Sequence, residues 1–141
     1  MRILAIDPGE KRVGLALSDP TGTIANPLLV LSHTAYDETA TRIVHLATEH
    51  AVEKIIVGHT LGPDGESTPA SRRARRLAGA IRSRTALLVE FWDETGSTQI
   101  ARAARLALGV SRKKRSGHLD EIAATVILQS YLNHLHGDPF F

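Results

Sequence analysis

Residues 3–18 read Ile-Leu-Ala-Ile-Asp-Pro-Gly-Glu-Lys-Arg-Val-Gly-Leu-Ala-Leu-Ser, and this stretch decides the fold. The apolar run Ile3 to Ile6 predicts a buried strand, which Pro8-Gly9 ends. Val13 to Ser18 alternates larger apolar residues with small ones, as a second strand would. A turn at Thr21-Gly22 and an extended segment from Leu28 to Leu31 would complete a three-strand meander.

Helices and strands alternate in the rest of the chain. A meander followed by this alternation predicts an α/β layer with a mixed sheet. Strand ends at Asp7, Gly58 and Asp93 should then lie near one edge, where open α/β sheets build their sites. The elements expected after the meander are a helix opening at Asp37-Glu38, a strand from Lys54 to Val57, a helix beginning at Ser67-Thr68-Pro69, a strand from Ala86 to Trp92, a helix from about Ser97 to Leu108, and a helix from about Leu119 to His134.

The length and composition limit the class of protein. The 141 residues fit one domain, expected over residues 1–135 with a short tail at 136–141. There is no cysteine, which excludes disulfides, thiolate metal sites and cysteine nucleophiles. The sequence shows no secretory signal and no apolar run near the roughly 18 residues of a membrane span, so we expect a cytoplasmic protein without membrane contact.

Basic residues are unevenly placed, although the net charge is only +2. Six arginines lie between Arg72 and Arg84, on the outer face of the predicted helix, and four bases in a row at 112–115 are expected in a loop. A solvated helix face and a solvated loop would look the same, but arginine also suits phosphate groups. The candidate nucleic-acid contacts are Lys11, Arg12, Arg72, Arg73, Arg76, Arg112, Lys113, Lys114 and Arg115.

Three acidic residues follow predicted strands. Asp7 ends an otherwise apolar strand, where a carboxylate is costly to desolvate unless it binds a cation or several donors. Capping of the strand end by an Asx-turn is the simpler interpretation of Asp7 alone. Asp93 and Glu94 follow another strand, and alone they could serve only to charge or cap the next helix.

Asp120 is more informative than the other acids. The residues three, four and seven positions after it are Ala123, Ala124 and Ile127, so it shares the apolar side of its helix. Acids from three segments at one sheet edge would repel each other, which implies a cation. All-oxygen ligation selects Mg²⁺ or Mn²⁺, and two such ions can activate water against a phosphodiester.

These residues also carry a family resemblance. The segment from Ile6 to Asp19 resembles the opening signature of the YqgF family, whose members are described as pre-16S rRNA nucleases or Holliday-junction resolvases related to RuvC and RNase H. Three further blocks agree in order and spacing, namely Val57 to Gly65, Trp92 to Thr98 and Leu119 to Leu132. The resemblance covers nearly the whole chain.

The resemblance implies an RNase H-like three-layer fold, with a mixed five-stranded sheet flanked by helices. It also implies a divalent metal held by Asp7, Glu94 and Asp120, with Asp93 as an accessory ligand. Two departures from the family pattern leave these ligands in place, and the first of them, the loss of an arginine, is expected to alter substrate positioning. Thr95 replaces an arginine, and His59-Thr60 stands where the central loop usually reads Leu-Pro after its glycine.

The resemblance implies either the 5′ end of precursor 16S rRNA or a four-way DNA junction as substrate, and we expect RNA because nothing in the sequence indicates a dimer interface. Junction resolution needs two active sites and hence a dimer, whereas we expect a monomer or a weak homodimer. An ATPase of the actin and sugar-kinase type also opens with an Asp-x-Gly turn, but this chain is too short for the second lobe. A catalytically idle RNA-binding module would gain nothing from clustered carboxylates.

Overall fold

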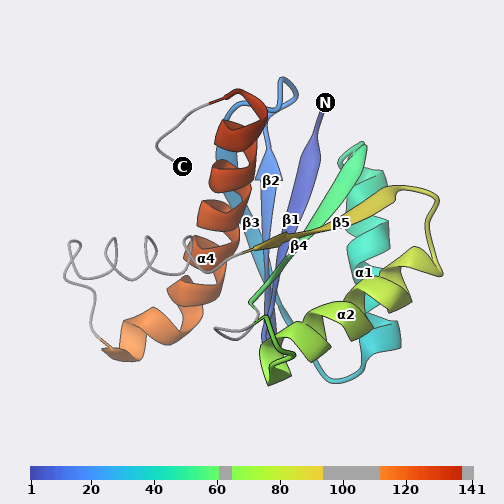
Figure 1. Cartoon of the computed structure of the whole chain (residues 1–141), viewed down its shortest axis with the longest axis vertical. Helices are drawn as coiled ribbons and strands as arrows, with labels where there is room; N and C mark the ends of the chain where they lie inside the picture. The colour runs from blue at the N-terminus through green and yellow to red at the C-terminus, as the bar shows by residue number, and fades with distance from the viewer. Residues whose placement is uncertain (61–64, 94–111, 138–141) are drawn as a thin grey trace.

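The computed structural model describes residues 1–60, 65–93 and 112–137, and in the stretch 112–121 it describes the backbone alone. In this part of the chain, strands and helices follow one another as the sequence predicts (Figure 1). No helix in these ranges has the length and apolar character needed to cross a membrane. The elements are β1 (Ile3–Pro8), β2 (Arg12–Ser18), β3 (Ala25–Ser32), α1 (Tyr36–Glu49), β4 (Lys54–His59), α2 (Pro69–Arg82), β5 (Leu88–Asp93) and α4 (Arg112–Leu135).

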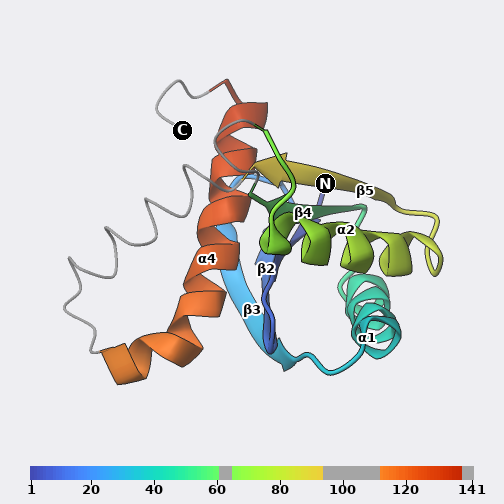
Figure 2. The ribbon, with the colours of Figure 1, turned by 60° about the horizontal axis from the view of Figure 1, so that its bottom comes forward.

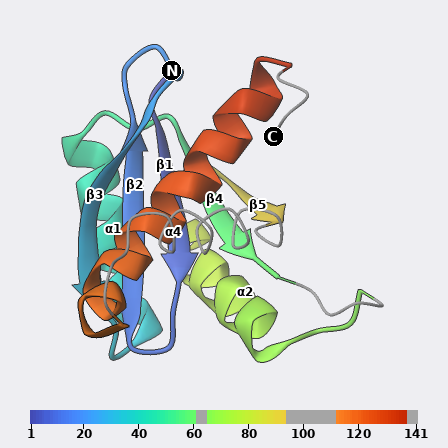
Figure 3. The same ribbon diagram turned by 90° about the vertical axis from the view of Figure 1, so that its left-hand side faces the viewer.

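The strands form one mixed sheet in the order β3-β2-β1-β4-β5. β1 pairs antiparallel with β2 and parallel with β4, so it is the central strand. β2 pairs antiparallel with β3, and β4 pairs parallel with β5. The predicted meander and mixed five-stranded sheet are therefore confirmed, and the carboxyl ends of β1, β4 and β5 lie at one edge (Figure 3).

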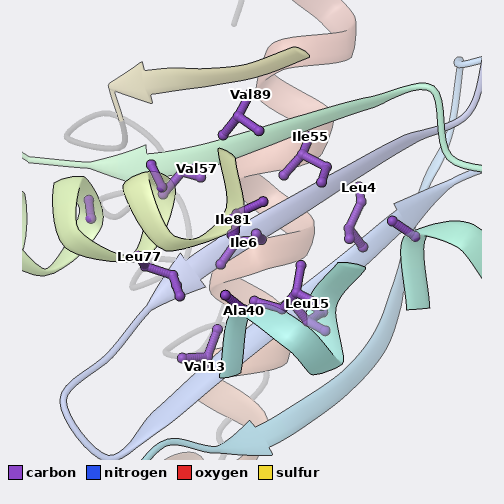
Figure 4. Close-up of a cluster of buried hydrophobic side chains, with 14 of the residues drawn as sticks. Leu4, Ile6, Val13, Leu15, Ala40, Ile55, Val57, Leu77, Ile81 and Val89 are labelled. Atoms are coloured by element: carbon purple, nitrogen blue, oxygen red, sulfur yellow. The ribbon is translucent and has the colours of Figure 1, made fainter. Parts of the chain in front are cut away.

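The two faces of the sheet carry separate apolar cores. Figure 2 shows α1 and α2 on one face and α4 on the other, which gives three layers. Alternation along β1 sends Leu4 and Ile6 toward α1 and α2, where they pack with α2 residues such as Leu77 and Ile81 (Figure 4). The intervening β1 residues on the other face belong to the α4 core; this second core comprises Ile3, Ala5, Ala16, Ile56, Ala124, Ile127, Leu128, Tyr131 and Leu132.

Several element boundaries differ from the sequence prediction. β3 begins at Ala25 rather than Leu28, because its first residues pair with the backbone of β2, which requires no apolar pattern. β5 begins at Leu88 rather than Ala86. The helix expected from about Ser97 to Leu108 lies outside the described residues.

The prediction of a basic loop at 112–115 is wrong. These four residues form the beginning of α4, which starts at Arg112 instead of near Leu119. Lysine and arginine are strong helix formers, so a run of them extends a helix as readily as it occupies a loop.

Gly9 occupies a turn between β1 and β2 that has no room for a side chain. A Cβ there would lie 2.2 Å from the backbone carbonyl oxygen of Arg12. We expect Gly9→Ala to lower the free energy of unfolding by about 1–3 kcal/mol, as overpacked sites do. Urea unfolding measures this, with Gly79→Ala in α2 as control, since a Cβ there meets nothing within 4 Å. The control should stabilise by roughly 0.5–1 kcal/mol, and equal effects of the two substitutions would contradict the argument.

Candidate functional site

Asp7 lies one residue before the end of the central strand, on the sheet face that α4 covers. It shares this face with Ile3 and Ala5, because side chains alternate along β1 and both residues belong to the α4 core. The side chain of Asp7 is half-buried, and it has a polar or charged partner in the fold. A carboxylate at this place faces the helix that carries Asp120.

Each of the two strands that flank β1 has a glycine beside Asp7. On β2, Asp7 pairs with Gly14. On β4, the residue after the pair Ile6–Val57 is Gly58. Neither neighbouring strand therefore adds a side chain next to the carboxylate, and the hard oxygen donor of Asp7 suits a small divalent cation.

Helix α4 approaches this face through a row of buried side chains. Ala124, Ile127 and Leu128 are at most 1% exposed and pack against the sheet. Asp120 precedes Ala124 by about one helical turn and lies within α4. Burial of Ala124 and Ile127 agrees with the predicted apolar side of the helix, while the side chain of Asp120 is outside the described set.

Asp93 is the last residue of β5 and is exposed. Val89 and Phe91, two and four residues earlier, face α2: Val89 is in that core, and the Arg82 guanidinium lies 5.2 Å from the Phe91 ring. Alternation therefore assigns Asp93 to the face opposite Asp7. Glu94 lies outside the described residues, among which no group of three or more acids or histidines gathers.

The predicted basic contacts divide into two groups. Lys11, in the turn just beyond Asp7, and Arg12, the first residue of β2, are exposed at the same sheet edge. The arginines of α2 begin at this edge too, because the Thr68 hydroxyl donates a 2.7 Å hydrogen bond to the carbonyl oxygen of Thr60 after β4. Arg72 is exposed there.

Two other α2 arginines, Arg76 and Arg73, are less available to bind a substrate than Arg72. The Arg76 guanidinium stacks on the Tyr36 ring at 4.4 Å, which joins α2 to α1. Arg73 is half-buried, and its Nε has no hydrogen-bond partner among the residues described. The side chains of Arg112, Lys113, Lys114 and Arg115 fall in the stretch described by backbone alone.

A small pocket opens between α2 and the carboxyl ends of β4 and β5. It has a volume of about 130 Å³ and is lined by His59, Ser71, Arg75 and Phe91. The His59 and Phe91 rings meet edge to face, with centroids 5.2 Å apart. Sequence reasoning missed this pocket, although His59 was already visible as a departure from the family pattern.

A partly buried network fixes the carboxyl half of α4 to the sheet. The Lys54 ammonium lies 2.8 Å from a Glu90 carboxylate oxygen and donates a hydrogen bond to the Tyr131 hydroxyl. The Trp92 ring packs edge to face on Tyr131 at 5.3 Å, and its Nε1 donates to the Ser130 hydroxyl at 3.3 Å. The network joins β4, β5 and α4, and the sequence alone gave no sign of it.

This network should make the free energy of unfolding depend on pH in the alkaline range. Burial lowers the pKa of Lys54, but its hydrogen bonds to Glu90 and Tyr131 outweigh burial, so the pKa lies above its ordinary value. A raised pKa in the folded state stabilises the fold below the unfolded pKa of about 10.4, and this stabilisation is lost as the pH rises through the folded pKa. Unfolding free energies measured from pH 9 to 12 should therefore fall more for the wild type than for Lys54→Met. Parallel curves would contradict this assignment.

The chain is similar to known proteins over most of its length. The family model "RuvX: Holliday junction resolvase" matches residues 1–134. A protein of Syntrophomonas wolfei subsp. wolfei is 37% identical over 133 residues, 94% of each chain, and one of Halothermothrix orenii is 37% identical over 140 residues, 97% of this chain and 100% of the relative. Both carry the name "Putative pre-16S rRNA nuclease".

Solved structures agree with the architecture. T. thermophilus RuvC, in complex with a Holliday junction substrate, superposes with a TM-score of 0.60 at 19% identity, covering 98% of this chain and 97% of that one. The fowlpox virus Holliday junction resolvase gives 0.56 at 14% identity, covering 95% and 99%. At these identities the likeness concerns the fold alone, which is the RuvC and RNase H-like fold that the sequence predicted.

Proposed function

This chain belongs to the RuvX family, also called YqgF, and from this membership we propose that it is a metal-dependent nuclease that processes the 5′ end of precursor 16S rRNA. Two relatives are 37% identical to this chain over nearly their whole length, and both carry the name of such a nuclease. The two solved structures whose names refer to Holliday junctions are less than 20% identical to this chain in sequence, so they support only the fold. The family model is itself described as a Holliday junction resolvase, so a four-way DNA junction is the alternative substrate, while the names of the relatives favour RNA.

The position of Asp7 carries the proposal. Its carboxylate is on the α4 face of the central strand, with Gly14 and Gly58 on either side. We assign Asp7, Glu94 and Asp120 as the residues that would hold Mg²⁺ or Mn²⁺, expected as a pair of ions. When bound, the ions would supply an activated water and stabilise the leaving sugar oxygen. Asp93, on the opposite face, is assigned an accessory role.

The basic side chains serve to hold the phosphate backbone. Lys11 and Arg12 extend from the turn beside Asp7, and Arg72 extends from the start of α2 at the same edge. Arg112 to Arg115 are proposed to contribute from α4. Arg76 is expected to add less, because its guanidinium already stacks on Tyr36.

RNA processing of this kind requires one active site, so a monomer or a weak homodimer suffices. Resolution of a four-way junction would require two sites related by symmetry. We propose that the domain spans residues 1–135 and that a C-terminal tail at 136–141 follows it.

The test is a cleavage assay that offers a 5′-extended 16S rRNA fragment and a four-way DNA junction in parallel. Each substrate is incubated with the protein and Mn²⁺, Mg²⁺ or EDTA. We expect the RNA to be cut with Mn²⁺ or Mg²⁺ and to stay intact with EDTA. Symmetric nicking of the junction alone would make the protein a resolvase. Binding of RNA without cleavage under every condition would favour an idle binding module.

A further inference from the structure

We propose that the pocket of His59, Ser71, Arg75 and Phe91 receives one unpaired base of the RNA next to the cleavage site. The inference rests on the proposed function, since it assigns a second contact to the same substrate. It would make the protein select RNA that is single-stranded beside the bond it cuts. No residue of this pocket belongs to the proposed metal site.

The walls of the pocket suit a flat ring better than a phosphate. Phe91 and His59 contribute ring surfaces that meet at 78°, and the volume of about 130 Å³ admits a group of limited size. The Ser71 hydroxyl is already used in the helix cap: it accepts from the Thr68 backbone N–H at 2.8 Å and donates to the Thr68 carbonyl at 3.0 Å. It therefore has little left to offer an anion.

The polar groups that remain are suited to the edge of a base. The Arg75 guanidinium contacts the Ser67 hydroxyl with one nitrogen and lines the pocket. Within the described chain, the contact that engages the His59 ring is its packing against Phe91. The imidazole nitrogens can therefore donate to or accept from a base that stacks on the aromatic wall, as in other single-stranded nucleic-acid sites.

The pocket lies at the same sheet edge as Asp7, because His59 lines it at the carboxyl end of β4. Val57 on β4 pairs with Ile6, and His59 is two residues beyond Val57. Because β1 and β4 are neighbouring strands, their backbones near Asp7 and His59 are separated by one strand spacing, which is about 4.8 Å. The two side chains lie on opposite faces, so a chain that crosses the edge from Asp7 passes the mouth of the pocket.

Only an unpaired base can enter such a pocket. In a duplex the base is stacked and paired, and proteins that read RNA bases generally take them from single strands, loops or ends. The pocket therefore points to a single-stranded segment next to the cleaved phosphodiester, consistent with a 5′ extension.

The test measures binding in EDTA, where cleavage does not interfere. The probe is a short single-stranded RNA that carries the fluorescent base 2-aminopurine at one position, moved along a series of oligonucleotides; a duplex of equal length is the comparison. We expect quenching at one position and tighter binding of the single strand. Phe91→Leu should weaken that binding by about 5- to 100-fold and abolish the quenching, while duplex affinity stays unchanged.

His59→Leu provides a second variant that the fold tolerates, since leucine usually occupies this place in the family pattern. It should also reduce the quenching. His45→Leu is the matched control, because His45 is exposed on α1 away from this edge. Urea unfolding of each variant identifies any that fails to fold.

The outcomes separate this inference from the proposed function. If the wild type binds and cuts RNA but Phe91→Leu and His59→Leu leave affinity and quenching unchanged, the base pocket is overturned and the nuclease assignment stands. If the wild type neither binds nor cuts RNA, both are overturned.

Discussion

Asp7→Asn should reduce phosphodiester cleavage by at least about 100-fold and leave the protein folded. Loss even of a group that only supports a metal ligand typically costs 10- to 100-fold in metal affinity or activity, so loss of a direct ligand should cost at least as much. Asparagine has nearly the same shape as aspartate but no charge, and Gly14 and Gly58 beside it leave no neighbouring carboxylate to replace it. The measurement is the initial rate on the 5′-extended rRNA fragment with Mn²⁺.

Two controls give this result its meaning. Asp19→Asn changes an aspartate whose carboxylate accepts hydrogen bonds from Thr23 and Ile24 within its own loop, and it should keep wild-type activity per folded molecule. Asp93→Asn, on the opposite sheet face, should lose much less than Asp7→Asn. Thermal stabilisation by Mn²⁺ supplies a readout besides activity, and it should disappear in Asp7→Asn. Full activity of Asp7→Asn would overturn the site.

Leu128→Ala is expected to lower the free energy of unfolding by about 2–5 kcal/mol, the usual range for a buried leucine. Leu128 is fully buried in the α4 core, where it packs between helix and sheet. Its removal leaves a cavity beneath the helix that carries Asp120. We therefore expect activity at a given temperature to fall along with the folded fraction, as followed by urea unfolding and by cleavage rates on one preparation.

The same helix offers a matched control. Leu135 ends α4 and is 48% exposed, so Leu135→Ala should change stability by no more than about 0.5 kcal/mol. Similar losses for the two variants would show that helix propensity, rather than packing of α4 on the sheet, controls this part of the molecule.

The strands were predictable wherever apolar residues mark them. Ile3 to Ile6 and Lys54 to Val57 are strands because every residue in the first run and most in the second are buried. The start of β3 was not predictable, since Ala25 and Asn26 are only partly buried or exposed and are held in the sheet by backbone pairing with β2. The four basic residues at 112–115 were expected in a loop, because charge by itself does not distinguish a loop from a helix.

The candidate site was predictable as a list of acids but not as an arrangement. The sequence indicated Asp7, yet its glycine neighbours on β2 and β4 follow only from strand order and register. Likewise, alternation along β5 separates Asp93 from Asp7. The contacts of Lys54 with Glu90 and Tyr131 join residues distant in sequence, so no local pattern could reveal them.

The placement of α4 against β1 has a consequence for synthesis on the ribosome. The strand β1 and the helix α4 lie side by side (Figure 1), and Ile3 and Ala5 share one apolar core with Leu128 and Leu132. Translation proceeds from the N-terminus at roughly 5–20 residues per second, so this side of the sheet stays uncovered until α4 has been made. The nascent chain thus exposes an apolar surface that a chaperone can bind. The face that carries Asp7 closes only when the residues around 124–132 emerge, so the site and its covering helix are completed together.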